Sequence, residues 1–172
     1  DEEIIAAETA FDNAVGMLSL AEPLKAPSAD ALFGEGGTWE TQYANQSYPN
    51  MFDGDINTYS NYDNKHASGG YGGIDFGAGN EKVITSIRYY YDDPWDWNRT
   101  YGRFEGSNDK ENWTTLAEYA ANVYPTETWN EIPISDTTAY RYVRVYSTKG
   151  YGNLCEVEFY GKGTDYVMLN DI

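Results

Sequence analysis

The chain has 172 residues, of which 41% are hydrophobic and 16% aromatic, so it is long and apolar enough for one globular domain with its own core. Its net charge of −17 argues against nucleic acid and anionic membranes as partners, because both attract basic surfaces. A neutral partner such as a glycan, or a cationic one, fits this charge. The single cysteine rules out an intramolecular disulfide.

The first 33 residues form a segment distinct from the rest of the chain. Prolines at positions 23 and 27 interrupt any continuous helix, and glycines at 34, 36 and 37 mark a turn. The apolar residues near helical spacing, which fit a short helix or an irregular packed arm, are Ile4, Ile5, Phe11, Val15 and Leu18. We therefore predict an N-terminal extension over residues 1–33, and the sequence gives it no role.

Between residues 34 and 161, short apolar runs alternate with glycine-rich turns, which is typical of an all-β fold. Strands are predicted near residues 74–77, 83–91, 103–106, 113–119, 140–146 and 156–160. Alternation places Ile87, Tyr89 and Tyr91 on one strand face. About eight such strands build a two-sheet antiparallel sandwich. Residues 162–172 are then a C-terminal tail or linker.

Side chains of other segments are also expected in the core. Val157 and Phe159 point inward from the last predicted strand, and Cys155 before them is interpreted as a buried thiol. Trp113 is expected in the core as well. A Cys–His catalytic pair is not supported, because the only histidine, His66, has no spacing to Cys155 that forms a known motif.

The stretch from Asp53 to Thr58 carries an oxygen-bearing side chain at every second position around one glycine. Such a loop can direct several hard oxygen ligands at one Ca²⁺ ion, although the same residues also suit a polar turn. An EF-hand needs glycine at loop position six and glutamate at position twelve, where this chain has Thr58 and Asn64. The EF-hand is therefore excluded, and any calcium site must be completed from elsewhere in the chain.

The order of these segments resembles a known family. The matching segments are residues 51–59 (MFDGDINTY), 73–77 (GIDFG), 84–89 (ITSIRY), 104–109 (FEGSND) with Asn112-Trp113, 141–145 (RYVRV) and 156–161 (EVEFYG). Together they resemble the discoidin, or coagulation factor 5/8 type C, domains, and family 32 carbohydrate-binding modules in particular. The resemblance covers roughly residues 38–161 and implies an eight-stranded jelly-roll sandwich of the galactose-binding type.

The resemblance also implies a structural calcium ion between the loop and the last strand. The loop ligands that it implies are the carbonyl of Asn50, the carboxylate of Asp53, the carbonyl of Asp55, and the carbonyl and hydroxyl of Thr58. The last strand adds the carbonyl of Cys155 and the carboxylate of Glu156. Two carboxylates with neutral oxygens suit Ca²⁺.

In this family the ligand binds to variable loops at one end of the sandwich. The candidate loops span residues 61–71, 92–101 and 149–153, and the candidate ligand-binding residues in them are Trp95, Trp97, Tyr151, His66, Arg99, Tyr71 and Asn98. Aromatic faces beside planar polar groups suit sugars. Three alternatives stay open: a tryptophan packed beneath its loop, a solvated His66, and Arg99 bracing the loop through Asp92, Asp93 or Asp96.

The expected function is non-catalytic binding of glycans. An adhesion or protein-interaction domain of a bacterial surface protein is the alternative, and the acidic residues beside Trp95 and Trp97 oppose insertion into anionic lipid. A glycosidase would need two carboxylates, and Glu156 and Glu158 lie about 6–7 Å apart on one strand face. However, the implied calcium site already uses Glu156, so we expect no enzyme.

The sequence context suggests an extracellular location. A chain that starts at Asp1 without methionine is interpreted as a mature or excised piece. A domain without disulfides that calcium stabilises is typical of a bacterial protein, secreted or attached to the cell surface. We expect it to be one module of a larger protein.

Overall fold

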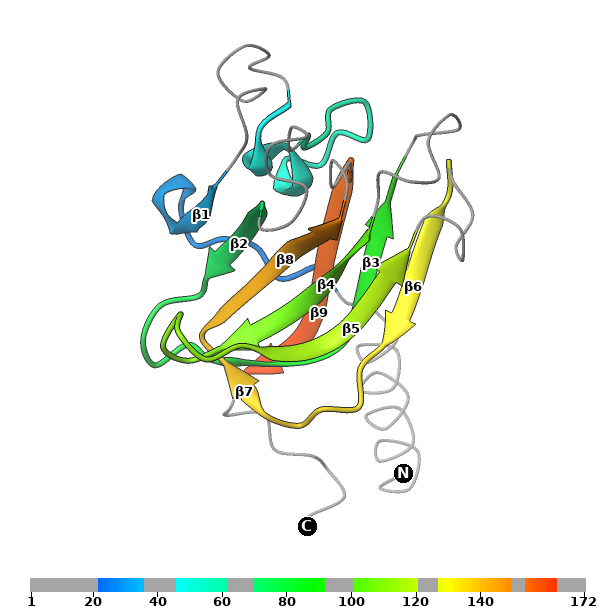
Figure 1. Cartoon of the computed structure of the whole chain (residues 1–172). Helices are drawn as coiled ribbons and strands as arrows, with labels where there is room; N and C mark the ends of the chain where they lie inside the picture. Colours follow the sequence, from blue (N-terminus) through cyan, green and yellow to red (C-terminus); the bar gives the residue numbers. More distant parts are fainter. Residues whose placement is uncertain are drawn as a thin grey trace, which may run out of the picture.

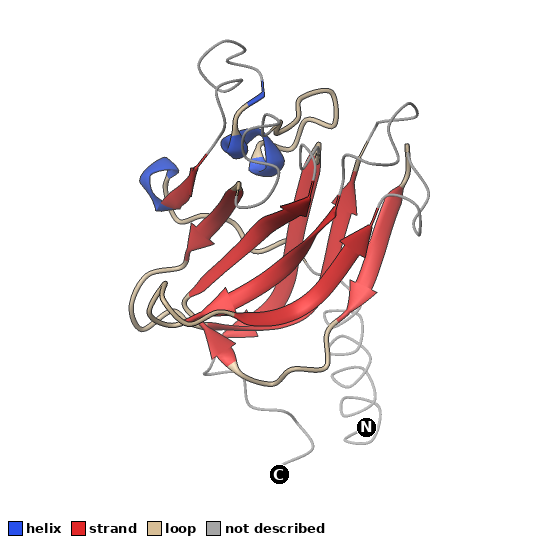
Figure 2. Ribbon diagram, in the orientation of Figure 1, coloured by secondary structure: helices blue, strands red, loops and turns tan. Residues whose placement is uncertain are grey.

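The computed structural model describes residues 22–35, 46–61, 70–91, 101–120, 127–149 and 154–163. These residues form two antiparallel β-sheets that stack as a sandwich (Figures 1 and 2). The predicted all-β, two-sheet antiparallel fold is therefore confirmed. The described helical elements include the short 3-10 turns η1 (Ala29–Ala31) and η3 (Tyr48–Phe52), and no described helix is long and apolar enough to cross a membrane.

One sheet has five strands in the order β1-β2-β8-β4-β5, and every neighbouring pair is antiparallel. The strands are β1 (Leu32–Glu35), β2 (Tyr71–Asp75), β8 (Tyr142–Lys149), β4 (Tyr101–Ser107) and β5 (Thr114–Ala120). The β2, β8, β4 and β5 strands correspond to segments predicted as strands, whereas β1 falls at the end of the predicted extension.

The second sheet is built around β3 (Lys82–Tyr90). Along one edge β3 pairs with β9 (Glu156–Gly163) over its full length. Its other partners are β6 (Trp129–Pro133), which pairs with residues 86–90, and the two-residue β7 (Ala139–Tyr140), which pairs with residues 82–83. The β9 pairing contains a bulge between Ile84 and Ser86.

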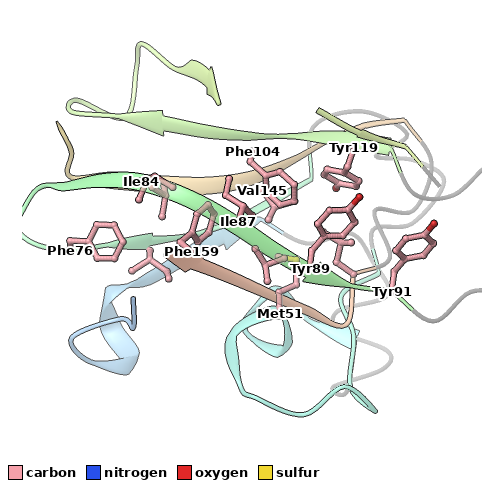
Figure 3. Close-up of a cluster of buried hydrophobic side chains, with 14 residues drawn as sticks. Met51, Phe76, Ile84, Ile87, Tyr89, Tyr91, Phe104, Tyr119, Val145 and Phe159 are labelled. Carbon is pink, nitrogen blue, oxygen red and sulfur yellow. The ribbon is translucent and has the colours of Figure 1, made fainter. Parts of the chain in front are cut away.

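The core lies between the sheets, and Figure 3 shows its buried aromatic and aliphatic side chains. The alternation predicted for β3 is confirmed, because Ile87, Tyr89 and Tyr91 are all buried there. Val157 and Phe159 also point into the core, and the Phe104 ring lies 6.2 Å from that of Phe159 across the sandwich.

Trp113 is not in the core, so that prediction is wrong. It is half-buried, with its ring 6.3 Å from Phe33 and 3.8 Å from the guanidinium of Arg144. Arg144 alternates along β8 with the buried Val143 and Val145 and so lies on the outer face of the five-stranded sheet. Trp113 packs on that outer face, where β1 supplies Phe33.

The segment before β1 covers an edge of the sandwich. The backbone N–H of Leu24 donates to the carbonyl of Phe159 at 2.7 Å and forms an isolated antiparallel bridge with β9. Leu24, Ala26 and Leu32 pack against the core. Part of the segment predicted as an extension thus lies against the outer edge of β9.

Candidate functional site

The loop after η3 brings three oxygen atoms together. Gly54 has a φ of +83°, a left-handed conformation that favours glycine and turns the chain sharply after Asp53. Asp53 Oδ1 accepts a hydrogen bond from the N–H of Asp55 at 2.8 Å. The Thr58 hydroxyl lies 2.8 Å from Asp53 Oδ2 and 3.0 Å from the carbonyl oxygen of Asp55. One side of the loop therefore presents a carboxylate, a hydroxyl and a carbonyl oxygen.

Glu156 approaches this loop from the first position of β9. Its side chain is buried, and its Oε1 accepts a hydrogen bond from the N–H of Gly54 at 2.7 Å. Burial, and second to it the neighbouring Asp53 carboxyl, raises the pKa of Glu156 to about 8. Within the described part of the chain, no lysine or arginine forms a salt bridge with Asp53 or Glu156. Two acidic side chains thus converge without a basic partner.

These residues fit a calcium ion. The described residues contain no group of three or more His, Cys, Asp or Glu side chains that could hold a metal, so a cation here depends on two carboxylates and neutral oxygens. The carboxylate of Asp55 is taken up by the backbone and side-chain N–H groups of Asn57, at 2.9 and 2.7 Å. The carbonyl oxygen of Asp55 accepts hydrogen bonds from the N–H and the hydroxyl of Thr58, at 3.1 and 3.0 Å, and hard oxygen donors of this kind suit Ca²⁺.

The two remaining predicted calcium ligands flank this centre. Asn50 lies in η3, and its side-chain amide donates to the carbonyl of Tyr59 at 3.2 Å. Cys155 is buried directly before β9, and its N–H donates to the carbonyl of Tyr90 at 2.9 Å. Both hydrogen bonds use N–H groups and not the carbonyl oxygens that the resemblance implies as ligands.

The strand ends that carry the three predicted ligand loops lie side by side. Tyr71, at the start of β2, pairs with Tyr146 near the end of β8, and Tyr101, at the start of β4, pairs with Lys149 at the end of β8. Because each of these ends adjoins a predicted ligand loop, the loops leave from one end of the five-stranded sheet. Six predicted ligand residues lie outside the described residues: Trp95, Trp97, Tyr151, His66, Arg99 and Asn98.

Tyr71, the remaining predicted ligand residue, lies on the outer face of the five-stranded sheet. Its ring is half-buried, 6.3 Å from the ring of Phe33 and 5.4 Å from the guanidinium of Arg144. Arg144 also stacks 4.7 Å from the ring of Tyr146 and forms a 2.7 Å salt bridge with the buried Glu105. No local sequence pattern indicates this Glu105–Arg144 pair, because it depends on the register between β4 and β8.

Comparison with solved structures supports a carbohydrate-binding type of domain. The family 62 carbohydrate-binding module (CBM62) of Clostridium thermocellum Xyl5A has 28% identity and a TM-score of 0.68, over 84% of this chain and 99% of that module. The C-terminal domain of a Bacteroides fragilis chitobiase has 16% identity and a TM-score of 0.61, over 84% of this chain and 100% of that domain.

A third solved structure is similar in fold. It is the CBM32 of AlyQ in complex with 4,5-unsaturated mannuronic acid, with 17% identity and a TM-score of 0.60, over 80% of this chain and 98% of that module. No curated protein matches the chain at a significant level. The F5/8 type C domain family matches residues 35–159, which is most of the sequence. The chain therefore belongs to the F5/8 type C domain family and resembles its carbohydrate-binding modules.

Proposed function

We propose that this chain is a non-catalytic carbohydrate-binding module, with a calcium ion that stabilises the sandwich and a glycan site on loops at one end. The observation that carries the proposal is the 28% identity to a CBM62 module over nearly the whole of that module. The neighbouring ends of β2, β4 and β8 support it, because the three aromatic-containing loops adjoin these strand ends at one end of the five-stranded sheet.

The glycan site combines aromatic faces with planar polar groups. Trp95 and Trp97 lie two residues apart and stack on the apolar faces of a sugar, while His66, Arg99 and Asn98 bind its hydroxyls. Tyr71 and Tyr151 complete the site from the neighbouring strand end and loop. Such a small site gives modest affinity, because its aromatic stacking and few hydrogen bonds only slightly exceed the entropy cost of association.

Asp53 and Glu156 hold the calcium ion through their carboxylates, with the carbonyl of Asp55 and the hydroxyl of Thr58. The carbonyls of Asn50, Thr58 and Cys155 complete the coordination. When bound, the ion neutralises the two carboxylates. The residues themselves join the loop after η3 to β9, so binding to the folded state alone stabilises the fold by linkage.

Two contacts argue against a glycosidase that uses Glu156 and Glu158. Glu156 faces Gly54 and Asp53 at the candidate calcium site. Glu158 forms a 3.2 Å salt bridge with Arg88 and accepts a hydrogen bond from the hydroxyl of Tyr160. Glu156 is thus held by a backbone N–H beside Asp53, and Glu158 by Arg88 and Tyr160, so the pair is not free to act as general acid and nucleophile.

The biological setting completes the proposal. Calcium can take over the stabilising role that disulfides have in many extracellular domains, which fits a secreted or cell-surface bacterial protein. We propose that the domain is one module of such a protein and that it directs the parent protein to a polysaccharide.

A glycan array tests the proposal. We expect the wild-type chain to bind a defined set of glycans, and Trp95→Ala/Trp97→Ala to lose that binding while its calcium-dependent melting temperature stays unchanged. The unchanged melting temperature is the control for folding. Failure of the folded, calcium-loaded wild type to bind any glycan would contradict the proposal and favour a protein-binding adhesion domain.

A further inference from the structure

A groove of about 610 Å³ crosses the outer face of the four-stranded sheet. The residues that matter in it come from three strands and from the segment before β1: Thr85 and Ser86, Arg88, Glu131, Tyr160 and Glu22. A volume of this size suits a ligand of one or two sugar rings. Ser86 lies five residues before Tyr91, so the groove is about 16 Å along β3 from the loop end of the sandwich.

The floor of the groove is a flat group of side chains held in place across the sheet. The guanidinium of Arg88 stacks 4.5 Å from the ring centre of Trp129 on β6. On its other side, Arg88 Nη1 lies 3.2 Å from Glu158 Oε2 and donates to the Tyr160 hydroxyl at 3.2 Å, both on β9. These contacts fix the Arg88 plane and the Tyr160 ring before any ligand arrives, which lowers the entropy that binding costs.

A β-bulge supplies hydroxyl groups at the rim. The register between β3 and β9 shifts between Ile84 and Ser86, so two consecutive residues, Thr85 and Ser86, both line the groove. Bulges redirect side chains in this way and occur often beside functional sites. The rim therefore presents two hydroxyls next to the planar floor, a combination that suits the hydroxyl groups of a sugar.

The charge of the groove identifies the kind of sugar. Glu158 pairs with Arg88, and two exposed carboxylates add to the charge of the groove: those of Glu131 on β6, which also attracts Arg88 through space, and Glu22. Neither accepts a hydrogen bond or forms a salt bridge with any residue in the described ranges. The groove therefore repels uronate and sulfate groups and attracts a cation.

The five-stranded sheet carries an arginine, tryptophan and glutamate group like the one around Arg88, but there the arginine is much less exposed. On the five-stranded sheet Arg144 also stacks on a tryptophan and pairs with a glutamate. There, however, the Arg144 side chain is only 13% exposed, against 34% for Arg88. The group around Arg144 is therefore closed by its neighbours, whereas the group around Arg88 forms the floor of an open groove.

We propose that this groove is a second saccharide-binding site, separate from the loop end, and that it takes a sugar that carries a protonated amine. The Tyr160 ring and the Arg88 plane lie against the face of the sugar. Thr85 and Ser86 bind its hydroxyls, and Glu131, with Glu22 opposite, binds the ammonium group. The site does not depend on the proposed loop site.

Three oligosaccharides with the same β-1,4-linked glucose backbone test the proposal: the hexamers of glucosamine, N-acetylglucosamine and glucose, which differ only at C2. Binding is measured by calorimetry on the whole chain at pH 5.5. We expect the glucosamine hexamer to bind about tenfold more tightly than the other two, as one charge-assisted hydrogen bond allows. Equal binding of all three, or no binding of the glucosamine hexamer, would overturn the proposal.

Matched variants locate the site. Glu131→Gln should weaken glucosamine-hexamer binding about tenfold, whereas Glu118→Gln, which removes the same charge from an exposed position on β5, should change it less than about twofold. Both residues are exposed on strands, so both variants are expected to fold. Equal effects of the two substitutions, or spermine binding as tightly as the hexamer, would reduce the interaction to non-specific charge attraction and overturn the proposal.

The Trp95→Ala/Trp97→Ala variant separates this groove from the loop site. We expect it to retain glucosamine-hexamer binding. Loss of that binding in the tryptophan variant with retention in Glu131→Gln would move the ligand to the loops and overturn the groove. A chain that binds the glucosamine hexamer through Glu131 but no other glycan would support the groove and contradict only the glycan site proposed on the loops.

Discussion

Two glutamates are buried in the described residues, and their surroundings are opposite. Glu105, 2% exposed on β4, lies between two arginines, with Arg144 Nη2 at 2.7 Å and Arg103 Nε at 3.1 Å. Glu156, 3% exposed on β9, faces another carboxylate, that of Asp53. The fold therefore supplies the counter-charge for one glutamate and withholds it from the other.

This difference distinguishes the structural ion pairs of Glu105 from the candidate cation site at Glu156. A buried carboxylate costs several kcal/mol unless it is paired, and the arginines around Glu105 supply that pairing within the chain. At Glu156 the only groups donated by the described chain are backbone N–H groups, and the nearby side chain adds negative charge. Protonation, favoured by the raised pKa of Glu156, relieves this cost without a cation, and a bound Ca²⁺ would supply the counter-charge instead, as proposed above.

The largest expected effect is on the paired glutamate. Glu105→Gln keeps the shape of the side chain but leaves Arg144 buried without a counter-charge, so we expect the free energy of unfolding to fall by about 3 kcal/mol. Denaturant unfolding measures the change, and calcium should not restore it. A loss of less than about 1 kcal/mol would show that the cluster around Arg144 is not a buried ion pair in energetic terms.

Substitution of the unpaired glutamate, Glu156, should not destabilise the protein when calcium is absent, in contrast to substitution of Glu105. In a chelator, burial beside Asp53 raises the pKa of Glu156 to about 8, so folding at neutral pH requires this carboxyl to take up a proton. Glu156→Gln removes that cost, so we expect the variant to be as stable as the wild type or more stable by about 1 kcal/mol. In calcium it should be the less stable protein. Denaturant unfolding in both buffers checks this, and a variant that is equally destabilised in both would contradict the reversal.

A smaller effect is expected where the ion pair is open to solvent. The side chains of Arg88 and Glu158 are 34% and 22% exposed, so screening by water weakens their attraction. Glu158→Gln should lower the free energy of unfolding by less than about 1 kcal/mol, well below the effect at Glu105. Matching losses at the two positions would erase the distinction between a closed cluster and an open groove floor.

The smallest effect concerns pH. Hydrogen bonds from Arg141 to Asp75, at 2.8 and 3.0 Å, lower the pKa of Asp75. The stability from this pair is present above the unfolded pKa of about 3.9 and is lost as the pH falls through the lower folded value. In Asp75→Asn we expect that acid-dependent loss to shrink by about 0.5 kcal/mol, measured by unfolding between about pH 5 and 2. An unchanged pH profile would contradict it.

Alternation along the strands could be predicted from the sequence because it depends only on local residue order. The period of two predicts Ile87, Tyr89 and Val157 on the core side of their strands, and all three are buried. The approach of Asp53 to Glu156 was implied by family resemblance rather than by any local pattern. This contact joins segments about 100 residues apart in the sequence, and no local pattern of residues predicts such a long-range contact.

The outer faces of the sheets could not be predicted for the same reason. Strand alternation identifies Arg144 and Arg88 as outward-facing but does not reveal which glutamate lies opposite each of them. Trp113 was misplaced because β1 covers the outer face with Phe33, so a large aromatic side chain finds burial outside the core. Register and the packing of a neighbouring segment decide these contacts.

A calcium titration of the wild-type chain tests whether Ca²⁺ binds between Asp53 and Glu156, with heat of binding and melting temperature recorded on the same samples. We expect one saturable site and a rise in melting temperature of about 5–10 °C at a calcium concentration one hundred times Kd. Glu156→Gln should abolish both, and Glu118→Gln should retain both. Identical melting of the wild type in calcium and in chelator, with no heat of binding, would contradict a calcium ion between Asp53 and Glu156.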